Sequence, residues 1–207
     1  MAEERRHHRP ALPGARHFER TDGGVDPAAA REAAERVAHL LVRGPHDPGD
    51  RAIVDRVVAL ADTEGLEEIA ELWANAPAAS LAGALWRLYL LRQWVHADPA
   101  GAAAEFERGR RARPVAEVVA GVAEPPGPEA VRSVVDAVLR GVVQGDFADT
   151  LFRASAFAQV TAAGRAASPA TGAGPADPAA DRSAARLRTL GDQLEACGRL
   201  ELDGRLH

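Results

Sequence analysis

The sequence contains no lysine, so all 25 of its Lys-plus-Arg residues are arginine. A P-loop of the nucleotide-binding kind needs a lysine against the phosphates, and that class of site is therefore excluded. Alanine, arginine and glycine are abundant, and Asn75 is the only asparagine. This usage is typical of a GC-rich genome, so the choice of arginine over lysine says little about function.

Cysteine is almost as scarce, because Cys197 is the only one in 207 residues. An intramolecular disulfide is impossible, which fits a reducing cytosol. The charged N-terminal sequence MAEERRHHRP is not followed by an apolar run, so we expect no secretory signal. The sequence therefore predicts a cytoplasmic protein.

Motifs that carry chemistry are missing as well. The sequence has no glycine-rich dinucleotide loop, no Gly-x-Ser-x-Gly elbow and no His-Glu-x-x-His or Glu-x-x-His metal motif. Cys197 lies alone on an apolar stripe, where a cysteine is more often core than nucleophile. His7, His8 and His17 lie in a polar segment without fixed geometry. We therefore assign no catalytic residue, no metal site and no cofactor.

The apolar residues that are present are densest in Leu81–Val95, which reads LAGALWRLYLLRQWV. On a helical wheel they cover nearly every face, so we expect a helix that neighbours bury on several sides. A membrane span needs about 20 residues with few charges, whereas this run is shorter and contains Arg87 and Arg92. We therefore expect a buried central helix and no membrane partner.

Helix start signals recur along the chain, as a capping aspartate, a proline in the first turn, or both. They lie at Asp26, Asp47, Asp98, Pro128 and Asp146. The valines of residues 131–142 follow a 3.6-residue period, which favours helix over strand. The sequence predicts an all-α fold, with a compact bundle of six or seven helices over residues 26–165 around the central helix.

Two segments lack this periodicity. We expect residues 1–25 to be a disordered tail and residues 166–178 to be a flexible linker. The remaining residues, 179–207, are predicted to form a C-terminal amphipathic helix and tail. Leu187, Leu190 and Leu194 are spaced by three and four residues along it. This helix either folds back on the core or binds a partner, which includes a second copy of the chain.

An aromatic group is a candidate ligand site. It consists of Trp73, Trp86, Tyr89 and Trp94. These side chains would line a small-molecule pocket, with Arg87 as an anion-binding group. They would equally form a filled core, with Arg87 paired to Glu68 or Glu71. A cavity beside Arg87 favours the pocket, and a packed core favours the structural interpretation.

An arginine-rich stretch is the second candidate. Its basic residues are Arg108, Arg110, Arg111 and Arg113. They would meet the phosphates of a nucleic acid. The net charge of −5 and the lack of interleaved aromatic residues weigh against that partner. The alternative is a solvated helix face paired with Glu105 and Glu107.

Three stretches are similar to uncharacterised helical proteins of GC-rich actinobacteria. They are Leu85–Trp94, Val119–Pro128, and Gly145-Asp146 with Ala154–Gln159. The resemblance extends over about residues 50–165. It implies no activity, and no site residue follows from it.

Taken together, these patterns favour a non-catalytic helical module that binds or regulates a protein partner. That partner includes a second copy of the chain, which would form a homo-oligomer through the C-terminal helix. Two other functions stay open. One is a small-molecule binder or enzyme that uses the aromatic group as a pocket. The other is a nucleic-acid or transcription accessory factor that uses the arginine-rich helix.

Overall fold

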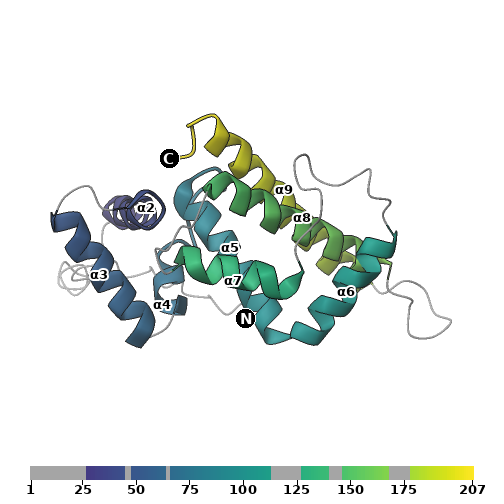
Figure 1. Cartoon of the computed structure of the whole chain (residues 1–207). Coiled ribbons are helices and arrows are strands. Elements are labelled where there is room, and N and C mark those ends of the chain that lie inside the picture. The colour runs from purple at the N-terminus through teal and green to yellow at the C-terminus, as the bar shows by residue number, and fades with distance from the viewer. Residues whose placement is uncertain (1–26, 45–47, 64–65, 113–126, 140–145, 168–177) are drawn as a thin grey trace, which may run out of the picture.

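The computed structural model describes residues 27–44, 48–63, 66–112, 127–139, 146–167 and 178–207, and every regular element in these ranges is a helix. The helices are α2 (Pro27–Arg43), α3 (Pro48–Thr63), α4 (Leu66–Glu71), α5 (Leu81–Ala97), α6 (Pro99–Ala112), α7 (Pro128–Leu139), α8 (Phe147–Ala166) and α9 (Pro178–Leu202) (Figure 1). The prediction of an all-α bundle with a further C-terminal helix is confirmed. The predicted tail and most of the predicted linker lie outside the described residues.

The helix starts follow from local capping. Ser80 precedes α5, and its Oγ accepts a hydrogen bond from the amide of Gly83 at 3.1 Å. Asp146 does the same for α8, where its Oδ1 lies 2.9 Å from the amide of Ala148. Asp98 caps the first turn of α6 in a similar way. These bonds satisfy amides that have no partner inside the helix, which is why the predicted starts are accurate.

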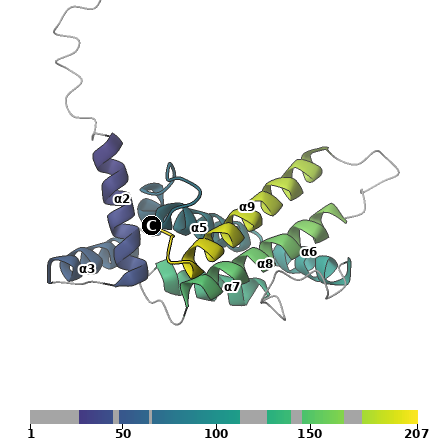
Figure 2. The same cartoon turned by 90° about the horizontal axis from the view of Figure 1, so that it is seen from above.

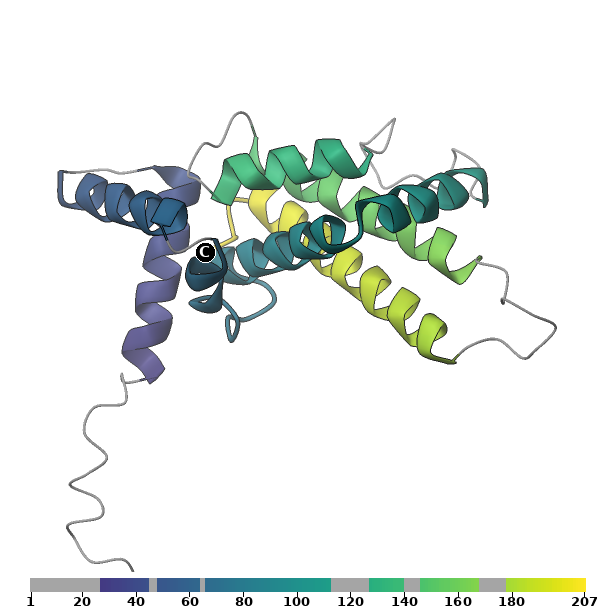
Figure 3. The same ribbon diagram turned by 90° about the horizontal axis from the view of Figure 1, so that it is seen from below.

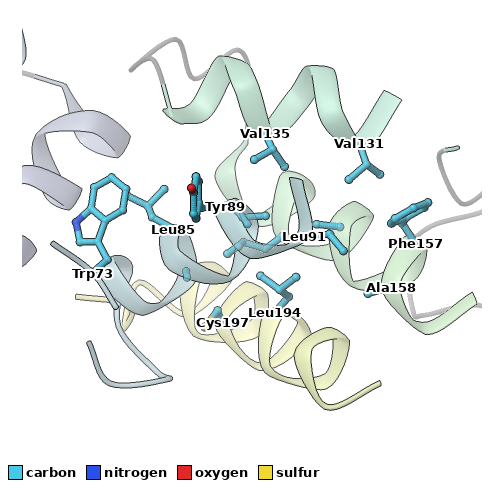
Figure 4. Close-up of a cluster of buried hydrophobic side chains, with 14 of the residues drawn as sticks. Trp73, Leu85, Tyr89, Leu91, Val131, Val135, Phe157, Ala158, Leu194 and Cys197 are labelled. Carbon is cyan, nitrogen blue, oxygen red and sulfur yellow. The ribbon is translucent and has the colours of Figure 1, made fainter. Parts of the chain in front are cut away.

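The predicted central helix, α5, crosses the middle of the molecule and contacts α2, α7, α8 and α9 (Figures 1 and 4). Its fully buried large side chains are Leu81, Leu85, Leu88, Leu91 and Val95. Burial of one leucine contributes about 1.5–3 kcal/mol, so this helix anchors much of the core. Figure 4 shows how α7, α8 and α9 surround it.

A second helix, α8, is buried at least as deeply as α5. Thirteen of its 20 residues are buried, against nine of 17 in α5. Many of the thirteen are alanine, serine, threonine or glycine, so α8 has little bulk of its own. Small side chains let neighbouring helices approach closely, and the two most extensive helix interfaces join α8 to α6 and to α9. The structure therefore has two central helices where the sequence predicted one.

The C-terminal segment closes the bundle beside α2 and the start of α5 (Figure 2). Gly204 adopts a left-handed φ of 65°, which turns the chain back after α9. Leu206 is then buried in the core, and the carbonyl of His207 accepts a hydrogen bond from the amide of Leu81 at 2.9 Å. Arg43 of α2 pairs with Glu201 of α9, so the C-terminal end of α9 is held against α2.

Candidate functional site

The predicted aromatic group is divided among three places, with Trp73 and Tyr89 buried and Trp86 and Trp94 partly buried against the core. Trp73 is fully buried, and its Nε1–H donates to the carbonyl of Ala34 on α2 at 3.0 Å. Trp86 stacks on Tyr89, with ring centroids 5.6 Å apart. Trp94 instead packs against Phe157 of α8. The guanidinium of Arg165 lies over the Trp94 ring, 4.7 Å from its centroid, in a cation–π contact. This arrangement favours the filled-core interpretation over a shared pocket.

Arg87 is partly buried and lies between α5 and α9. Its Nε donates to Gln193 Oε1 at 2.6 Å, and its Nη1 donates to the carbonyl of Gly83 at 2.7 Å. Burial lowers the pKa of this guanidinium, against the opposing influence of nearby Cys197. The structure shows these two oxygens as the partners of Arg87 where the sequence predicted a carboxylate. Of the two predicted carboxylates, Glu71 is exposed, and the side chain of Glu68 lies outside the described part. Neutral oxygens therefore hold a charge that we expected an acid to hold.

Cys197 is a buried thiol and not an activated nucleophile. Its Sγ donates to the carbonyl of Ala78 at 3.2 Å, and only 1% of the residue is exposed. Burial raises the pKa of this thiol, while Arg87 opposes the rise. A nucleophilic cysteine needs a lowered pKa and access to solvent, and Cys197 has neither.

The leucine seam of α9 faces the interior of the same chain. Leu187 and Leu194 are buried and Leu190 is partly buried against the core. Figure 4 shows Leu194 directed from α9 toward the leucines of α5. Of the two alternatives for this helix, the structure therefore favours folding back on the core, because the leucines that were candidates for partner binding contact the protein's own core.

The arginine-rich stretch on α6 is divided between two environments. Arg108 reaches across to α8, where its Nε donates to the carbonyl of Gly164 at 3.2 Å. Arg110 pairs with Glu107 at 3.4 Å, and Arg111 is exposed. Arg113 lies outside the described residues. Only part of this stretch is therefore free to meet a ligand, which weakens the case for a nucleic-acid site.

The outer face of α9 carries a feature that the sequence reasoning missed, an open groove of about 390 Å³. We call it the α9 groove, and it is lined by Arg182, Ala185, Arg186, Thr189, Leu190 and Gln193. The residues follow helical spacing, so the stripe is visible in the sequence once one looks beyond the leucine seam. Gln193 connects the groove to Arg87.

Two basic side chains line the α9 groove. Arg182 and Arg186 are exposed, and neither forms a salt bridge with any residue that the structure describes. Leu190 lies beside them as an apolar floor. Small-molecule sites enclose most of their ligand, whereas this groove is open and lined by one helix. Its shape and chemistry suit the side chains of an acidic, partly apolar protein surface.

The described ranges contain neither a candidate metal site nor a candidate membrane span. Within them no group of three or more histidine, cysteine, aspartate or glutamate residues is placed to hold a metal ion. Nor does any helix described there have the length and apolar character to cross a bilayer.

Comparison of the chain with protein-family models, with curated proteins and with solved structures gives no match. The similarity to helical proteins of GC-rich actinobacteria stays a prediction.

Proposed function

We propose that the protein is a non-catalytic helical module that acts by binding another protein chain at the α9 groove. The observation that supports this function is the pair Arg182 and Arg186, which form no salt bridge within the described part of the chain, beside the partly buried Leu190. Arginine next to apolar surface is a combination enriched at protein interfaces. The inner face of α9 packs on the core, so the helix presents these residues from a fixed support.

The alternatives receive less support. A small-molecule binder needs an enclosed pocket, whereas the aromatic residues are packed against one another and against α8. A nucleic-acid factor needs free arginines on α6, whereas Arg108 and Arg110 already have partners. We place the proposed module in the cytoplasm, because its single cysteine, Cys197, is kept as a thiol.

Site-specific photo-crosslinking tests this function. A photoreactive residue at Thr189, in the groove, should form one discrete adduct in cells that naturally produce the chain. The same residue at exposed Ala104 on α6 is the control and should form none. Arg186→Glu should abolish the adduct from position 189. Equal adducts from both positions, or an adduct that survives Arg186→Glu, would contradict the proposal.

A further inference from the structure

One acidic stretch of the chain lies apart from the α9 groove in sequence. Residues 47–71 contain eight carboxylates and only two arginines. Glu67 and Glu71 on α4 are exposed, and neither forms a salt bridge with a described residue. Leu72, the next residue, is 50% exposed although it is a large hydrophobic side chain. We call Glu67, Glu71 and Leu72 the α4 corner.

The α4 corner and the α9 groove have opposite charge and matching spacing. Residues 182–190 contain three arginines and no acid. Glu67 and Glu71 are four residues apart, as are Arg182 and Arg186. Residues four apart lie on one face of a helix at about 6 Å, so the two pairs can meet carboxylate to guanidinium. Leu72 would then come next to the apolar floor at Leu190.

The two surfaces cannot meet within one molecule. Figure 1 shows α4 in the half that holds α2 and α3, and Figures 1 and 3 show the first turns of α9 in the half that holds α6. A contact between them therefore requires two molecules. An antiparallel pair satisfies both contacts at once, and such a twofold arrangement closes without further growth.

We propose that the occupant of the α9 groove is the α4 corner of a second copy of this chain. This inference rests on the proposed function and names the partner of the same site. Charge complementarity supports this assignment. Each surface has two charges, spaced four residues apart, that form no salt bridge among the residues described, and the two pairs are of opposite sign. Each pair lies beside one exposed or partly exposed leucine. Exposed ion pairs are screened by salt, so the assembly is a weak, salt-sensitive dimer.

Sedimentation velocity on the full-length protein tests the dimer across about 10–500 µM, a range suited to weak association, at low and high salt. The wild-type chain should dimerise with rising concentration and dissociate at high salt. Arg186→Glu and Glu71→Arg should each weaken dimerisation by about tenfold or more, because each places like charges together. The double variant, Arg186→Glu with Glu71→Arg, should restore it.

Matched controls are available for both changes. Arg111→Glu and Glu32→Arg alter the net charge equally, at exposed positions outside the two surfaces, and should leave the dimer intact. A wild-type chain that is monomeric throughout, or a double variant no better than the singles, overturns self-association. The proposed function survives such a result if the photoreactive residue at position 189 still crosslinks to a different protein in an Arg186-dependent manner. If no adduct forms, the proposed function is wrong as well.

Discussion

The helices around α8 and those around α4 are packed in different ways. Next to α8 the backbones almost touch: a Cβ on Gly164 would lie 1.8 Å from the carbonyl oxygen of Glu105, and one on Gly109 would lie 1.9 Å from that of Val160. Along α3, most described side chains are exposed or only partly buried. Trp73, two residues after the end of α4, connects that side to α2 through one buried hydrogen bond.

The helices around α8 therefore hold their neighbours more tightly than the helices around α4 do. Arg165 braces the first region, where it binds Glu105 at 2.8 and 3.0 Å, Ser183 at 2.8 Å and the ring of Trp94. These contacts join α5, α6, α8 and α9, so the α9 groove is held in place. The α4 corner is held by fewer buried groups, and we expect it to open at a lower free energy.

Trp73→Ala should have the largest effect, because it removes the main connection of the α4 side. The side chain is fully buried, and loss of a buried tryptophan costs about 3–5 kcal/mol. Trp73→Phe keeps most of the packing and loses the indole N–H, so it should cost only about 1–2 kcal/mol. Urea unfolding measures both. A cost below about 1 kcal/mol for Trp73→Ala would mean that α4 is not docked as described.

Gly164→Ala tests the other side of the comparison. The new methyl group would overlap backbone atoms that cannot move aside as a flexible side chain can, so we expect a loss of about 3 kcal/mol. Gly127→Ala is the control, since a Cβ there meets nothing within 4 Å, and it should change stability by less than about 0.5 kcal/mol. If the two variants unfold at the same urea concentration, the close approach of α6 and α8 is wrong.

Arg87→Ala examines the contact between α5 and α9. It removes charge-assisted hydrogen bonds to Gln193 and to the Gly83 carbonyl, together with the packing of the stem. We expect a loss of about 1–3 kcal/mol, below the cost of breaking a buried ion pair. Arg111→Ala, at an exposed site on α6, should cost less than about 0.5 kcal/mol. Equal midpoints in urea for the two variants would place Arg87 in water and contradict a buried α5.

Alkaline pH should produce the smallest effect, through Cys197. Its folded pKa is raised, so the folded chain keeps the proton that the unfolded chain releases above the ordinary value of 9.0. The stabilisation is complete below about pH 9 and is progressively lost as the pH rises above it. Tyr89 adds a loss of the same sign at higher pH, because burial also raises its pKa. Unfolding of Cys197→Ala should depend less on pH between 8 and 10; an identical dependence would place the thiol in solvent.

Local signals in the sequence account for much of the fold. Proline and aspartate mark the helix starts because they act on the adjacent turn, and the apolar residues of α5 reveal its burial directly. The depth of α8 was harder to predict, since alanine and glycine carry little hydrophobic signal although they permit close packing. The partner of Arg87 was missed because Gln193 is more than 100 residues away in sequence. The α9 groove was missed because the leucine seam, which shares Leu190 with it, is the stronger pattern along this helix.

The central claim is that α9 is docked on its own core through its leucine seam and leaves the groove on its outer face. Hydrogen–deuterium exchange on the dilute wild-type chain tests it directly. Amides from about Ala184 to Gly198 should exchange as slowly as those of α8, because the two helices share one buried interface. Fast exchange over this part of α9, with α8 still protected, would show that the seam is free and would contradict the account.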